Sequence, residues 1–126
     1  MKYRSIKQLC FLITCVVSLF AYADDDGTLV FSVNGDSVTV TGCVDSCPEA
    51  LVIPSKIQDV PVTQIGSSAF SGATSLTSVT LPGSVTSIAE RAFQDTGLTS
   101  ITIPDAVVSI GNYAFQRASL TSLTLG

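Results

Sequence analysis

The sequence predicts a solenoid, in which coils of similar sequence stack on one another and an N-terminal β-hairpin covers the first coil. Three observations lead to this fold class. A unit of 22 residues repeats without a gap, apolar residues recur at the same phases of each unit, and an alternating stretch precedes the repeats. We therefore expect a leader over residues 1–23, a hairpin cap over residues 24–50 and about three coils over residues 51–126.

The first 23 residues have the three parts of a secretory signal peptide. Lys2, Arg4 and Lys7 give a positive start, Leu9–Phe20 is an apolar run, and Ala21-Tyr22-Ala23 is a small-x-small cleavage site. The alternative is a buried N-terminal helix. The apolar run is too short to span a bilayer. We expect an exported protein (periplasmic, cell-surface or secreted) without membrane insertion after the leader is removed.

The charge of the remaining chain excludes some partners. Ten acidic and three basic residues follow Ala23, which gives a formal charge of −7. There is no basic patch, so nucleic acid and anionic membrane surfaces are poor partners. The run Asp24-Asp25-Asp26 matches no calcium loop, and a solvated acidic stretch is the favoured interpretation.

Two cysteines remain after the leader, since Cys10 and Cys15 lie within it. Cys43 and Cys47 have C-x3-C spacing in a chain bound for an oxidising compartment, which favours a structural disulfide. A metal site would need more ligands, and the sequence has no histidine. A redox-active pair is the other alternative, but its C-x-x-C spacing is missing. We expect no metal and no cofactor.

The cap is predicted from Thr28–Thr41, where two alternating runs flank Asn34-Gly35. This dipeptide is the strongest short hairpin signal. With both residues in the turn, Phe31 pairs with Val38 and Leu29 pairs with Val40. The apolar face can cover the first coil, and the other face carries Ser32, Ser37 and Thr39.

The repeat is clearest in Leu76–Gly97 and Leu98–Ser119, which are identical at 11 of 22 positions. A looser unit begins at Leu51, and Leu120–Gly126 begins another that is not completed. A period in the low twenties is typical of a solenoid.

Each unit contains a strand pattern followed by a turn pattern. Val79 and Leu81 alternate with polar residues as in a half-buried strand, which Pro82 ends. Ile88, Ala92 and Phe93 then share one face of a helical or 3₁₀ turn. Because Phe93 and Phe115 occupy the same place in successive units, we expect their rings to stack inside the solenoid.

The stretch LTSVTLPGSVTSIAERAF resembles the leucine-rich repeats of the BspA type, whose units read L-x-x-[VI]-x-[LI]-P, then V-x-x-I and A-F. The resemblance covers roughly Leu51–Gly126. It implies a right-handed solenoid with parallel strands on one wall and short turns or helices opposite. It also implies a secreted or surface protein that binds macromolecules through the strand wall.

No catalytic constellation is visible, and we expect no enzyme activity. The chain lacks histidine and a G-x-S-x-G motif, and its serines have no base nearby. Glu90, Asp95 and Asp105 fall at surface positions of the coils, and the sites equivalent to Glu90 and Asp105 carry Asn112 and Gly83. What remains is a surface of Ser and Thr side chains on the strand wall. The candidate ligand-binding residues are Thr77, Ser78, Thr80, Thr99, Ser100, Thr102, Thr121, Ser122 and Thr124.

Three functions compete. The favoured one is a non-catalytic binding module of adhesion type that recognises protein or glycan through this wall. The second is a structural or self-assembling repeat fragment that associates through an apolar edge formed by Leu120, Leu123 and Leu125. Such an exposed edge indicates either that the chain is a truncated relative of longer repeat proteins or that another chain covers the edge. The third, remote, is an ice-binding surface of regularly spaced hydroxyls.

Overall fold

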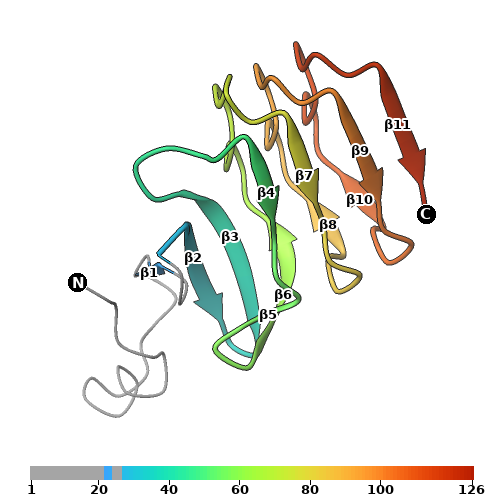
Figure 1. The fold of residues 1–126 in the computed structure, drawn as a ribbon. Helices are drawn as coiled ribbons and strands as arrows, with labels where there is room; N and C mark the ends of the chain where they lie inside the picture. Colours follow the sequence, from blue (N-terminus) through green and yellow to red (C-terminus); the bar gives the residue numbers. More distant parts are fainter. Residues whose placement is uncertain (1–21, 24–26) are drawn as a thin grey trace.

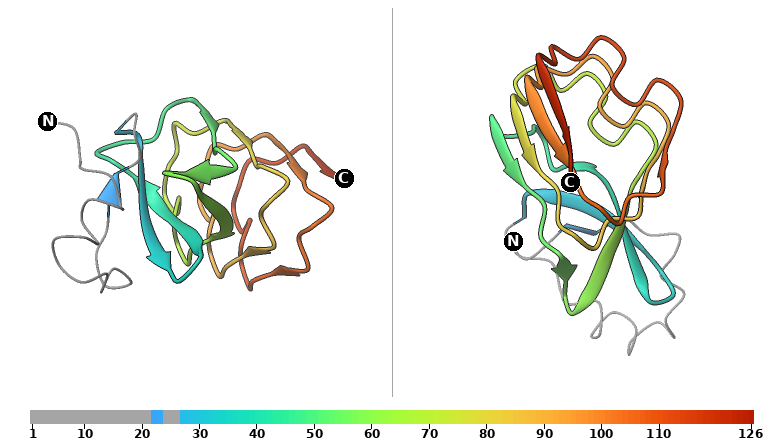
Figure 2. Two further views of the ribbon diagram at one scale, coloured as in Figure 1. Left: turned by 90° about the horizontal axis from the view of Figure 1, so that it is seen from below. Right: turned by 90° about the vertical axis from the view of Figure 1, so that its right-hand side faces the viewer.

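The computed structural model describes residues 22–23 and 27–126 and forms an all-β solenoid (Figure 1). The predicted leader, apart from its last two residues, and the run Asp24-Asp25-Asp26 lie outside the described residues. The coils are related by translation along one axis, so equivalent segments of successive coils lie side by side (Figure 2). A parallel-strand solenoid is the predicted fold class, and this prediction is confirmed.

One sheet forms a wall that we call the strand wall. It contains β4 (Ala50–Val52), β7 (Ser78–Thr80), β9 (Ser100–Ile103) and β11 (Ser122–Leu125), all parallel. Each strand alternates residues that face the core with residues that face solvent: Val79, Ile101 and Ile103 are buried, and their neighbours in the strands are exposed.

A second sheet lies on another side of the coils. Its order is β1 (Tyr22–Ala23), β2 (Leu29–Asn34), β3 (Ser37–Cys43), β6 (Val60–Ile65), β8 (Ser87–Ile88) and β10 (Ser109–Ile110), and β5 (Lys56–Ile57) pairs with β6. The strands β6, β8 and β10 are parallel and come one from each coil. The V-x-x-I part of each repeat thus forms short strands that the sequence analysis did not predict.

Hydrogen-bonded turns close each coil where the sequence predicted a helical or 3₁₀ turn; the described residues contain no helix. In the unit Leu76–Gly97 the amides of Arg91, Phe93 and Asp95 donate to carbonyls of the next coil. Only the amides between them make local bonds, such as Gln94 to the Arg91 carbonyl. The amides of alternate residues are thus used between coils, which prevents a continuous helical ladder.

Left-handed backbone conformations make this alternation possible. Arg91 and Asp95 have φ of 58° and 56°, and Tyr113 and Arg117, one coil later, have φ of 61° and 57°. In the first coil the same two positions are Ser68, with φ of 56°, and Gly72, with φ of 79°. The strained conformation therefore recurs in every coil, mostly without glycine.

The core is a column of side chains inside the coils. Phe70, Phe93 and Phe115 stack, with centroids 5.3 Å and 5.4 Å apart, which confirms the predicted stacking of Phe93 on Phe115. Phe70 and Phe93 are fully buried.

The N-terminal hairpin extends the second sheet, because β3 pairs in parallel with β6. Its buried face contains Leu29, Phe31, Val33, Val38 and Val40 and belongs to the same hydrophobic cluster as the coils. The predicted pairing of the hairpin is wrong by two residues: Phe31 pairs with Val40, and Asn34 pairs with Ser37. The turn residues are Gly35 and Asp36, and only Gly35 among them has positive φ, 60°, as the first position of a type II′ turn allows.

Candidate functional site

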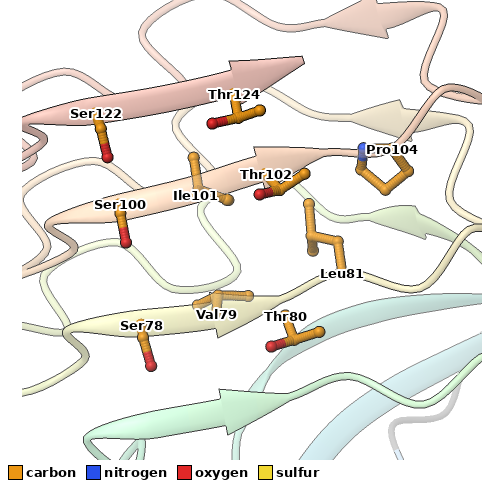
Figure 3. A pocket seen from close by; sticks show the side chains of 10 residues that line it. All are labelled: Ser78, Val79, Thr80, Leu81, Ser100, Ile101, Thr102, Pro104, Ser122 and Thr124. Atoms are coloured by element: carbon orange, nitrogen blue, oxygen red, sulfur yellow. The ribbon is translucent and has the colours of Figure 1, made fainter. Parts of the chain in front are cut away.

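Six side chains of the strand wall form a regular array, which we call the hydroxyl grid. In each of β7, β9 and β11 one Ser and one Thr point outward, and all six residues are exposed. The strands are in register, with Ser100 opposite both Ser78 and Ser122, and Thr102 opposite Thr124. Figure 3 shows the three serine side chains pointing the same way and the three threonines lying in a second row. The grid comprises Ser78, Thr80, Ser100, Thr102, Ser122 and Thr124.

The grid lines an open hollow of about 600 Å³. The remaining lining residues are Val79, Leu81, Ile101 and Pro104, and none of the ten is charged or aromatic. A volume of this size is typical of sites for small ligands or for part of a larger one. Any ligand there meets hydroxyl groups, methyl groups and backbone, and no ionic partner.

The hydroxyls of the grid are available to a ligand. Across the part of the chain that the structure describes, none of the six makes a hydrogen bond to the protein. Each can donate one hydrogen bond and accept two. In the absence of a ligand they face solvent, so a ligand replaces water and does not compete with protein groups.

The flanking threonines, in contrast, hold the coils together. We call Thr77, Thr99 and Thr121 the threonine column. The Thr77 hydroxyl donates to the Glu49 carbonyl at 3.1 Å, and the Thr121 hydroxyl donates to the Thr99 carbonyl at 3.2 Å. The Thr99 hydroxyl donates to the Thr77 carbonyl at 3.4 Å. The same carbonyls also accept the amide of the threonine concerned. The column therefore repeats for a structural reason, although the sequence analysis grouped it with the ligand-binding candidates.

The grid stops at the first strand of the wall, a boundary that the sequence analysis missed. Ala50 lies opposite Ser78, and Val52 lies opposite Thr80. Both are exposed, Val52 by 69%, but neither has a hydroxyl. Aligning Ala50–Ile53 with Ser78–Leu81 would have revealed the change.

The other predicted sites lie elsewhere. Cys43 and Cys47 are joined by a disulfide with Cα atoms 5.2 Å apart, and the Ser75 hydroxyl donates to the Cys47 carbonyl. Glu90 and Asp95 form exposed ion pairs with Arg91 and Arg117, each at 3.6 Å. Asp105 is exposed. These carboxylates are not brought together, and the described residues contain no cluster of three potential metal ligands.

The predicted apolar edge lies on the last described coil. Leu123 and Leu125 are 46% and 72% exposed, whereas their register partners Ile101 and Ile103 are buried. Leu120 is half-buried and packs against the core. Within residues 22–23 and 27–126, no helix has the length and apolar character of a membrane span.

Comparisons with known proteins agree with this geometry. Residues 48–126 match the family model of the BspA type leucine rich repeat region (6 copies). A leucine-rich repeat protein from Bacteroides capillosus has a similar structure, with a TM-score of 0.56 and 23% identity over 79% of this chain and 95% of that one. The pneumococcal vaccine antigen PcpA is also similar, with a TM-score of 0.54 and 21% identity over 87% of this chain and 38% of that one. No curated protein matches the sequence.

Proposed function

The chain belongs to the BspA-type leucine-rich repeat family, and on this basis we propose that it is a non-catalytic binding module that acts outside the cytoplasm. Its ligand, a protein or a glycan at a cell surface, binds to the strand wall. In this proposal residues 51–126 carry the site and residues 24–50 act as their cap. Export depends on the predicted signal peptide, and the name of one similar structure, a vaccine antigen, supports exposure at a surface.

The hydroxyl grid is the single observation that carries this proposal. It combines six exposed hydroxyls without protein partners, regular spacing and a hollow of about 600 Å³. Such a surface recognises a ligand by hydrogen bonds, which contribute about 0.5–1.5 kcal/mol each. Because aromatic anchors are absent from the hollow, we expect weak binding per coil.

The test is a binding screen of the chain against cell-surface proteins and glycans, followed by a variant of the wall. Ser100→Arg with Thr102→Arg places two large cations in the middle of the grid and should abolish binding to any ligand found. The matched control is Val108→Arg with Ser109→Arg, which adds the same charge at exposed positions next to and within β10, in the second sheet. Retained binding by the wall variant, or equal loss in the control, would contradict the proposal.

A second function, assembly of copies, is favoured by the apolar edge. Besides Leu123 and Leu125, the last described coil exposes Ile110 by 45%, whereas its register partner Ile88 in the preceding coil is buried. Apolar faces of this kind are commonly covered by another protein surface. We propose that two copies of the 126-residue chain associate through this edge, and the corresponding experiment is given in the Discussion.

A further inference from the structure

We infer that the strand wall binds a neutral, extended polysaccharide of β-linked sugars, which crosses the strands with one sugar residue per coil. The inference rests on the proposed function, since it names the ligand class of the same site. It follows from the charge, the spacing and the extent of the hydroxyl grid.

The charge of the site favours a neutral ligand. No ionisable side chain lines the hollow, so neither a carboxylate nor an ammonium group of a ligand would find a counter-charge there. The chain after Ala23 carries ten acidic and three basic residues, which disfavours acidic polysaccharides at long range. Hydroxyls of a neutral sugar, in contrast, both donate to and accept from Ser and Thr hydroxyls.

The spacing of the grid favours a sugar chain over an extended peptide. Neighbouring parallel strands lie about 4.8 Å apart, which sets the distance between successive ranks of the grid. An extended chain of β-1,4-linked hexoses advances by about one such spacing per sugar, so each sugar can lie over one rank of one Ser and one Thr, with alternate edges of successive sugars facing the wall. An extended peptide advances about 3.3 Å per residue and repeats its faces every ~6.6 Å, so neither of its spacings matches the distance between ranks.

The grid also provides apolar contacts that suit sugar rings. Each of Thr80, Thr102 and Thr124 has a γ-methyl beside its hydroxyl, and Leu81 and Pro104 line the same hollow. The C–H groups of a hexose can pack on these methyls while its hydroxyls reach the serine row. Each rank of the grid therefore offers a methyl group for the C–H groups of a sugar and hydroxyl groups for its hydroxyls.

The extent of the grid sets the length of the ligand. Of the four strands that the structure describes in the wall, only β7, β9 and β11 carry an outward Ser and Thr, because Ala50 and Val52 occupy the corresponding positions of β4. These two residues are close isosteres of Ser and Thr without the hydroxyl. The described wall thus has three binding ranks, and we expect a trisaccharide to fill them.

The experiment measures affinity against ligand length by calorimetry, using the full chain and neutral β-linked glucose and N-acetylglucosamine oligosaccharides of two to six sugars. Affinity should rise up to three sugars and then stay level. Thr102→Val, which keeps the shape and the methyl, should weaken the trisaccharide about three- to tenfold through the lost hydrogen bond. Ser109→Ala, in the second sheet, is the matched control and should change nothing.

A gain-of-function variant makes the test sharper. Ala50→Ser with Val52→Thr adds a fourth rank to the grid at exposed positions. The tetrasaccharide should then bind about three- to tenfold more tightly than to the unmodified chain, and the trisaccharide should bind no more than about twofold more tightly, because a fourth rank adds only a second register for it. A plateau that stays at three sugars would overturn the assignment of one sugar to each coil.

The remaining outcomes separate this inference from the proposed function. Absence of binding to both oligosaccharide series, or equal affinity for α-linked glucose oligosaccharides, would overturn the inference. If a protein from the screen then binds and is lost in the Ser100→Arg and Thr102→Arg variant, the proposed function stands without it. Oligosaccharide binding that survives in this variant would overturn both.

Discussion

The ring of Phe93 lies parallel to the ring of Phe115, with an interplanar angle of 1° and centroids 5.4 Å apart. Phe70 continues the same stack on the other side of Phe93. The Phe93 ring is thus covered on both faces by equivalent rings of neighbouring coils. Its contribution to the free energy of unfolding therefore depends on the presence of both neighbouring coils.

Replacing Phe93 by Ala should lower the free energy of unfolding by about 3–5 kcal/mol, since the side chain is fully buried. Phe115→Ala should cost clearly less, because Phe115 is only half-buried. Urea denaturation followed by circular dichroism measures both. Equal losses at the two positions would show that the stack does not transmit stability between coils.

The threonines of the wall should separate into two groups by isosteric substitution. Thr77→Val removes the hydrogen bond to the Glu49 carbonyl and should destabilise the fold by about 0.5–1 kcal/mol. Thr80→Val removes a hydroxyl with no protein partner and should leave stability unchanged within about 0.5 kcal/mol. Chemical denaturation of the two variants compares them directly, and the reverse order would contradict the assigned roles.

Glycine should be favoured at the left-handed positions of the turns. Arg117 has φ of 57°, and glycine already occupies the equivalent position 72. Arg117→Gly should raise the free energy of unfolding by up to about 1 kcal/mol, since relief of the strained backbone outweighs an exposed ion pair with Asp95. Arg117→Ala is the control, because it loses the ion pair and keeps the strain. Its melting temperature should not exceed that of the unmodified chain.

The assembly proposal predicts a change of mass. Leu123→Lys with Leu125→Lys should convert oligomers of the 126-residue chain to monomers, because each Lys would place a charge in the apolar contact. Sedimentation velocity at tens of micromolar measures the mass, and Ser122→Lys with Thr124→Lys, on the outer face of the same strand, is the control. An unmodified chain that is already monomeric would contradict the proposal.

Much of the fold could be predicted because periodicity is a local property of the sequence. The phases of Val79, Leu81 and Phe93 within one unit are sufficient to place the strand, its inward face and the aromatic column. The turns were not predictable in the same way. Arg91 and Tyr113 are not residues that normally signal a left-handed backbone, and only the hydrogen bonds to the next coil explain their conformation.

Part of the candidate site could also be predicted from a local pattern of the sequence. Alternation with buried residues identified Ser78 and Thr80 as outward-facing. It could not distinguish them from Thr77, whose hydroxyl bonds to a carbonyl 28 residues earlier in the chain. The hairpin register was mistaken because Asn34-Gly35 was placed at the centre of the turn, whereas Gly35 and Asp36 form it.

The hydrogen bonds between coils give the stack a polarity. In the threonine column, amides and hydroxyls of each later coil donate to the coil before it. In the turns, the amides of Phe70 and Phe93 donate the other way, to Ala92 and Ala114 of the coil that follows. A further coil can therefore continue this pattern in one orientation only. Two copies that meet face to face would oppose donors to donors in the turns, so the turns contribute no backbone hydrogen bonds to such a contact.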